Sequence, residues 1–407
     1  MIVYFDAVPK PKKVEKLEDL DPVIELYHHT IRAGKYTEAE VLYYDRLRTS
    51  LYYQFGAYQT IIELLRSLFV NGEDKEPPLD TDDKKAFTLN ELANSYSLSG
   101  QPRRAVPLFE MQNALQEKAG DKKHLAIGLG NVADDQLKIG ALSEAERNLR
   151  RAISLSQETG NEENVGSWQY FLGHVFAYCG KWNESEKLLQ LAEEVKKKSN
   201  HVQAQSVIWA YRALRFLLMA RETVDSNQLS VDSVKSAIQS AQRALELADE
   251  QARTSTPNEL NYVEAHWLLG AAYRANGDLE KAEFHLNESI SRCRKINLVM
   301  DEADILLDLS KLRHAQGDSA EALRLAQEAS FITERSGYVL QGADVNLWLA
   351  EFTLAEIREK RIESSKGKEQ ARKYAESALK LAECEGGDYK YKVAYDEAVA
   401  LLERLKV

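Results

Sequence analysis

The stretch from residue 266 to residue 282 reads H-W-L-L-G-A-A-Y-R-A-N-G-D-L-E-K-A, and its arrangement decides the fold. The pair Leu269-Gly270 is followed by Tyr273, Gly277 interrupts the helical pattern, and Ala282 comes five residues later. Small residues at a helix crossing let two antiparallel helices approach closely, while large neighbours fill the grooves beside them. A glycine between the helices supplies a tight or left-handed backbone. The stretch therefore predicts two antiparallel helices joined at Gly277.

The same arrangement recurs along the chain, mostly at a spacing of 40 residues. The glycines that separate two helical patterns are Gly34, Gly100, Gly140, Gly180, Gly277 and Gly317, and the small residues that follow them include Ala105, Ala145, Ala282 and Ala322. Two further units lack the glycine but keep an alanine ladder, at 237–244 and 371–378, and each has a longer polar link between its helices, at 222–230 and 360–369. Regular repetition of a helix pair is typical of a solenoid.

These residues resemble the tetratricopeptide repeat, whose signature is W-x₂-L-G-x₂-Y followed by Gly and small residues. The resemblance covers roughly residues 20 to 405 and implies an all-α, right-handed superhelical solenoid of about eight antiparallel helix pairs. The segment 51–69 with Gly56 is a degenerate extra pair, and a last helix at about 391–405 caps the array. We expect a linker at 1–18, N-terminal repeat-like pairs at 19–84, and a continuing array at 85–405.

Composition limits the partners. The 407-residue chain has a formal net charge of −11, so a nucleic-acid backbone is a poor partner for it. Its longest apolar run is too short to cross a membrane. The three cysteines are far apart and form no C-x-x-C pair, which is typical of reduced thiols in a cytoplasmic protein. We therefore expect no nucleic-acid partner, no membrane span, no metal and no cofactor.

Catalytic motifs are missing from the sequence. It contains no G-x-x-x-x-G-K-[ST], no G-x-S-x-G and no H-E-x-x-H. The adjacent His28 and His29 diverge on a helix and cannot share a metal. The sequence therefore predicts a non-catalytic protein.

The N-terminal third resembles the repeat arm of STAND-type signalling ATPases. The resemblance rests on E-D-L-D-P-V-I-E-L-Y-H-H at 18–29, A-G-K-Y-T-E-A at 33–39 and L-Y-Y-Q-F-G-A-Y at 51–58. In that family the arm senses a ligand or partner and relieves autoinhibition of the ATPase. The resemblance implies that this chain is the sensing arm, with an ATPase module in the same parent chain, or a stand-alone relative without its own phosphate-binding loop.

A second interpretation is a stand-alone scaffold or adaptor. Repeats of 40 residues look like those of cell-polarity adaptors and kinesin light chains, and the stretch Leu129-Gly130-Asn131 is adaptor-like. Both interpretations predict a protein or peptide ligand.

The candidate site is the concave groove. In tetratricopeptide arrays the first helix of each pair lines this surface, and amides with aromatic side chains there suit an extended peptide. By the repeat register, Ala271 and Leu307 face it as well. The candidate partner-binding residues are Asn90, Asn94, Asn131, Asp134, Tyr170, His174, Tyr178, Trp267, Arg274, Lys311 and His314.

Overall fold

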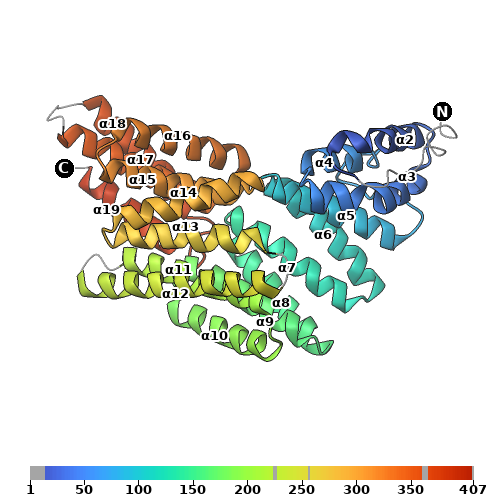
Figure 1. Ribbon diagram of the computed structural model, residues 1–407, viewed down its shortest axis with the longest axis horizontal. Helices are drawn as coiled ribbons and strands as arrows, with labels where there is room; N and C mark the ends of the chain where they lie inside the picture. The colour runs from blue at the N-terminus through green and yellow to red at the C-terminus, as the bar shows by residue number, and fades with distance from the viewer. Residues whose placement is uncertain (1–13, 223–226, 255–256, 360–364, 406–407) are drawn as a thin grey trace. The chain divides into compact units, whose positions relative to one another are not determined.

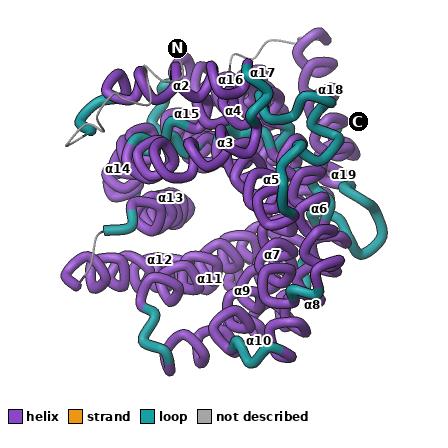
Figure 2. The backbone as a smooth tube through the Cα atoms, turned by 90° about the vertical axis from the view of Figure 1, so that its right-hand side faces the viewer, coloured by secondary structure: helices purple, strands orange, loops and turns teal. Residues whose placement is uncertain are grey.

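Helices and their connecting turns make up the computed structural model, which describes residues 14–222, 227–254, 257–359 and 365–405 (Figure 1). By packing, the chain divides into two compact units, residues 1–135 and 136–407. The tube in Figure 2 is helical almost throughout its described length, and a single isolated β-bridge joins Gly386 to Tyr389. The all-α solenoid class is confirmed, whereas the boundary predicted between residues 84 and 85 stays a prediction.

The first unit begins with short, irregular helices and continues with long ones. Its elements are η1 (Leu17–Leu20), α2 (Asp21–Arg32), α3 (Tyr36–Leu42), the π-helical turns η2 (Tyr43–Leu47) and η3 (Thr49–Gln54), α4 (Tyr58–Arg66), α5 (Asp82–Leu98), α6 (Pro102–Ala119) and α7 (Lys122–Lys138), whose last turn passes into the second unit.

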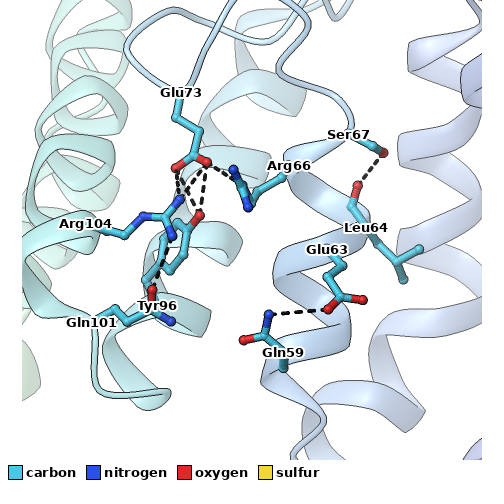
Figure 3. A network of polar contacts seen from close by, with 9 residues as sticks. All are labelled: Gln59, Glu63, Leu64, Arg66, Ser67, Glu73, Tyr96, Gln101 and Arg104. Atoms are coloured by element: carbon cyan, nitrogen blue, oxygen red, sulfur yellow. Dashed lines mark hydrogen bonds and ion pairs between the residues drawn. The ribbon is translucent and has the colours of Figure 1, made fainter. Parts of the chain in front are cut away.

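One carboxylate ties the loop after α4 to the pair α5 and α6. Glu73 accepts hydrogen bonds from the Tyr96 hydroxyl at 3.0 Å, from Arg104 Nη2 at 2.9 Å and from Arg66 Nε at 2.6 Å (Figure 3). The Arg104 guanidinium also lies 4.1 Å from the centre of the Tyr96 ring. Shared charge-assisted bonds of this kind fix a loop more firmly than single exposed pairs do.

The second unit contains regular helix pairs. Its elements are α8 (Leu142–Glu158), α9 (Glu162–Tyr178), α10 (Trp182–Lys198), α11 (Val202–Glu222), α12 (Asn227–Thr254), α13 (Glu259–Ala275), α14 (Leu279–Lys295), α15 (Val299–Ala315), α16 (Ser319–Ser336), α17 (Val339–Glu359), α18 (Ser365–Ala382) and α19 (Lys392–Arg404). The last of these corresponds to the predicted capping helix and packs on α18, α17 and α11.

The crossings explain why small residues recur. Ala105, Ala145, Ala282 and Ala322 are fully buried. A Cβ atom on Gly270 would lie 2.5 Å from Cγ of Leu286, a distance that real Cβ atoms do not reach. The six predicted linking glycines all have positive φ, between 71° and 87°. The helices therefore touch backbone to backbone, as the repeat pattern predicts.

Buried serines reinforce these close approaches. Ser185 donates to the Gly173 carbonyl at 2.6 Å, and Ser310 donates to the Ala322 carbonyl at 2.6 Å. Each bond joins the two helices of one pair. A hydroxyl can reach the facing backbone only because the side chains at the crossing are small.

The predicted polar links are shorter than expected. Helix α12 already begins at Asn227 and α18 at Ser365, so the sequence pattern placed the helix starts too late. The remaining link residues, 223–226 and 360–364, lie outside the described part of the chain. Residues 227–230 and 365–369, predicted as parts of the links, belong to α12 and α18 instead.

A histidine pair lies where α13 packs on α14. Nδ1 of His266 and Nδ1 of His285 are 2.9 Å apart, so one ring donates its proton to the other and at least one ring is neutral. Burial, together with the charge of His285, lowers the pKa of His266 to about 4. Burial also lowers the pKa of His285.

This pair predicts a loss of stability in mild acid. An unfolded histidine titrates near 6.5, so between pH 6.5 and 4 the unfolded chain binds more protons and falling pH destabilises the fold. A shift from 6.5 to about 4 corresponds to about 3 kcal/mol. We expect His266→Gln to flatten the pH dependence of unfolding by about this amount. Urea unfolding from pH 7 to 4 checks it, and equal slopes for the variant and the wild-type chain would contradict it.

Candidate functional site

The second unit has a partly open cavity of about 280 Å³ on the side formed by the first helices of its pairs. Helices α9, α11, α13, α15 and α17 contribute to it, with one residue from α12 and one from the segment just before α19. This volume lies at the lower end of ordinary ligand sites. The lining residues are Tyr178, Leu214, Leu217, Leu218, Ala220, Arg221, Val234, Trp267, Ala271, Arg274, Ala275, Asp304, Leu307, Asp308, Lys311, Asp344 and Tyr391.

Arg221 organises one side of the cavity. Its Nη2 lies 2.7 Å from Oδ1 of Asp344 and 2.6 Å from Oε2 of Glu397, and its Nη1 donates to the Tyr391 hydroxyl at 3.0 Å. That hydroxyl in turn donates to Oδ2 of Asp344 at 2.8 Å. A residue at the end of α11 thus holds α17 and α19 together, far along the chain.

Asp308 organises the opposite side. Its Oδ2 accepts a hydrogen bond from the Trp267 indole at 2.9 Å, and its Oδ1 lies 2.9 Å from Nη2 of Arg274. The two donors come from α13, and the acceptor comes from α15. The contact therefore fixes the rotamers of an aromatic side chain and a cation that both face the cavity.

Two other charged groups are not matched in this way. Asp304 accepts only a 3.3 Å hydrogen bond from the Gln341 amide, and burial, together with Asp301 and Asp344, raises its pKa well above the usual range. Lys311 has no hydrogen bond or ion pair to any described residue, and burial lowers its pKa. The cavity thus holds one carboxyl and one amine whose charged forms are poorly stabilised.

Four predicted site residues meet at this cavity: Tyr178, Trp267, Arg274 and Lys311. Ala271 and Leu307, which share their register, line it too. The repeat register thus places these side chains together, although their role in binding stays a proposal.

Three other predicted residues of this unit lie elsewhere. Tyr170 is buried against Leu189 and Ile208, so its expected outward orientation is wrong: its ring packs 5.9 Å from that of Tyr211. His174 stacks on Tyr211 at 4.0 Å. His314 lies edge-on to the rings of Trp348 and Phe352. Aromatic side chains on the first helix of the following pair, α11 or α17, contact all three residues.

The remaining four belong to the first unit. Asn94 donates its amide to the Asn90 carbonyl at 2.9 Å, one turn back on α5. Asn90, Asn94, Asn131 and Asp134 are all half-buried on α5 and α7. Their involvement in binding stays a prediction.

Sequence reasoning missed Arg221, Asp304, Asp308, Asp344 and Tyr391. A signal for two of them was present, because Asp304, Asp308 and Lys311 stand at i, i+4 and i+7 and so share one helix face. Arg221, Asp344 and Tyr391 meet only through the curvature of the unit, which the repeat pattern does not specify.

Other chemistry is not evident in the described residues. They contain no group of three or more His, Cys, Asp or Glu side chains placed to hold a metal ion. Among the same residues, no helix is both long and apolar enough to cross a membrane. The thiols of Cys179, Cys293 and Cys384 are free, and burial raises the pKa of Cys179 to about 12.

Comparison with known proteins supports the repeat assignment. A tetratricopeptide-repeat family model matches residues 263–288 and 303–328, which lie in the pairs α13/α14 and α15/α16. A curated relative, tetratricopeptide repeat protein 29 of Trypanosoma brucei brucei, is 26% identical over 229 residues. That match covers 53% of this chain but only 44% of the relative's own length.

Solved structures share the fold. A Rap protein complexed with competence and sporulation factor gives a TM-score of 0.60 at 14% identity, covering 90% of this chain and 99% of that chain. The Rap conjugation gene regulator of the plasmid pLS20, in complex with the Phr* peptide, gives 0.61 at 12% identity, covering 90% and 98%. The chain thus carries tetratricopeptide repeats at residues 263–288 and 303–328, and it folds as an all-α solenoid like these solved structures.

Proposed function

We propose that the chain is a non-catalytic binding module that holds a peptide, or a segment of another protein, in the cavity of its second unit. The observation that carries this proposal is the cavity itself, where Trp267, Tyr178 and Arg274 converge with apolar side chains. Aromatic and arginine side chains in enclosed pockets usually supply most of an interface's binding energy. The Rap structures of similar fold, one of them in complex with the Phr* peptide, support a ligand of this class.

A blocked cavity tests the proposal. Ala271 lies on α13, is 5% exposed and lines the cavity, so Ala271→Trp should fill much of the space a ligand needs. Peptides and proteins retained from native lysate by the wild-type chain are identified and their affinities measured. We expect Ala271→Trp to weaken binding by about a hundredfold or more, within the range of interface hot spots.

Outer-face variants provide the control. Arg147→Ala on α8 and Lys187→Ala on α10 change exposed side chains of second helices and should leave affinity within about twofold. The proposal is contradicted if these variants weaken binding while Ala271→Trp, folded to the same helical content, binds like the wild type.

The resemblance to the STAND sensing arm refines this proposal. The resemblance rests on the sequence of residues 18–140. In this form the cavity senses a ligand on behalf of an ATPase module in a parent chain. The adaptor interpretation keeps the same cavity without that module, and a cytoplasmic location suits both.

The sensing-arm and adaptor interpretations predict the same behaviour of the chain toward ATP. Because the chain lacks a phosphate-binding loop, we expect it to neither bind MgATP in calorimetry nor hydrolyse it. Hydrolysis that co-purifies with the chain through successive columns, and that changes when a cavity residue is replaced, would contradict a non-catalytic role.

A further inference from the structure

Two charged lining groups of the cavity form no ion pair with any described residue, whereas the other four charged groups do. Arg221, Arg274, Asp308 and Asp344 are each held in ion pairs of 2.7–2.9 Å. Lys311 has no ion pair or hydrogen bond within the described chain, and Asp304 has only the Gln341 amide. Both side chains are half-buried, and burial disfavours the charged form of each. A ligand group of opposite charge that bound beside either of them would stabilise that charged form.

The spacing of the two groups defines what such a partner must carry. Asp304 and Lys311 are seven residues apart on α15, which puts them on the same face, about 10 Å apart along the helix axis. An extended peptide of three or four residues spans about the same length between its ends. A ligand that satisfies both groups needs a cation and an anion at this separation.

The surface between the two groups is apolar. Leu307 lies between them on α15, and Leu214, Leu217 and Leu218 face the same cavity from α11. Asp308, also on this face, is already bonded to Trp267 and Arg274. The middle of the ligand is therefore expected to be uncharged and largely apolar.

We infer that the cavity selects a zwitterionic peptide segment of three or four residues, with its ammonium on the Asp304 carboxylate and its carboxylate on the Lys311 ammonium. The inference rests on the proposed function and adds the chemistry of the ligand. The two charges come either from the termini of a free short peptide or from lysine and glutamate side chains of a longer segment.

Three tetrapeptide libraries distinguish these sources: one with free termini, one acetylated and amidated without charged side chains, and one capped but carrying Lys and Glu at opposite ends. We expect the wild-type chain to retain members of the first or the third library in affinity selection. We expect the uncharged capped library to bind at least about tenfold more weakly. Equal retention of the uncharged library, or no retention of either charged library, overturns the inference.

Single variants assign each charge. Lys311→Met should remove the affinity that the ligand's carboxylate contributes. The amidated and free-acid forms of a retained peptide should then bind this variant equally well. Asp304→Asn should remove the affinity that the ligand's ammonium contributes. Lys187→Met, which changes an exposed side chain of α10, should leave both contributions to the affinity unchanged. If the Lys311→Met variant shows the same ratio of affinities for the free-acid and amidated peptides as the wild-type chain, Lys311 does not bind the ligand's carboxylate.

Stability without ligand gives an independent readout. Because Lys311 forms no hydrogen bond or ion pair with a described residue and burial disfavours its charged form, Lys311→Met should raise the melting temperature, by about 2 °C or more. A fall in melting temperature would show that Lys311 supports the fold and would overturn its role as a ligand group. If Ala271→Trp abolishes binding while Lys311→Met and Asp304→Asn do not change charge preference, the proposed function stands and this inference fails.

Discussion

Replacing Arg221 by methionine is expected to destabilise the second unit by about 3 kcal/mol. Removal of one member of a buried ion pair typically costs 3–5 kcal/mol, because the partner charges stay buried. Here Asp344 and Glu397 would both lose their cation, and the Tyr391 hydroxyl would lose a donor. The lower end of the range applies because Arg221 is 28% and Glu397 31% exposed. The free energy of unfolding in urea measures the effect.

Arg243 supplies the matched control. It pairs with Glu246 on the same helix, and the two side chains are 45% and 58% exposed. Arg243→Met should therefore cost less than about 1 kcal/mol. Adding Asp344→Asn and Glu397→Gln to Arg221→Met should restore part of the loss, because the orphaned charges are gone. Equal costs for the two single variants would show that the Arg221 network contributes little to holding α19 on α11 and α17.

Placing aspartate at Ala145 is expected to destabilise the chain by about 3 kcal/mol or more. Ala145 is fully buried in α8, which packs on α9. Overpacking a close crossing costs about 1–3 kcal/mol, and an unpaired buried carboxylate adds to this. Since each repeat is stabilised by its neighbours, melting should begin around α8 and spread. Thermal unfolding followed by hydrogen exchange measures both the loss and its starting point.

Arg147→Asp introduces the same residue on the exposed face of the same helix, next to Glu144. It should cost less than about 1 kcal/mol, which separates the effect of burial from that of helix propensity. If the two aspartates cost the same, the repeat register that places Ala145 at the crossing is wrong.

The repeat itself was predictable because the requirement behind it is local. A close helix crossing demands a small residue five positions after a glycine turn, and Ala105, Ala145, Ala282 and Ala322 meet that demand. A second series was overlooked: Gly120, Gly160 and Gly337 also have positive φ and end the second helix of a pair. Each lies 20 residues after one of the predicted linking glycines, at the turn from one helix pair to the next.

Helix starts were harder to place. The stretches Ser143-Glu-Ala-Glu146 and Asp318-Ser-Ala-Glu321 both have the form of a capping box, whose first residue is expected to cap the helix. Asp318 does cap α16, accepting from the Glu321 amide at 3.1 Å. Helix α8 instead starts at Leu142, so Ser143 already lies in its first turn, where its amide and hydroxyl both donate to Glu385. A contact across 242 residues thus replaces a local cap.

In the candidate site, too, some features follow from the local repeat and others depend on contacts between distant parts of the chain. Register alone places Tyr178, Trp267, Arg274 and Lys311 on the inner helices, and all four line the cavity. The groups that complete the opposite wall of the cavity depend on how the helix pairs curve. Arg221 meets Asp344 and Tyr391 only because the end of the unit returns to α11, and a single repeat contains no signal for that return.

Hydrogen exchange with and without a bound ligand tests the central claim, that the inner cavity is the binding site. With a peptide or protein retained from lysate at saturation, we expect slowed exchange in α11, α13 and α15, and in the turn before α19. The outer helices α10, α14 and α16, which contribute no residue to the cavity, should exchange as in the free protein. Protection confined to those outer helices would contradict the account.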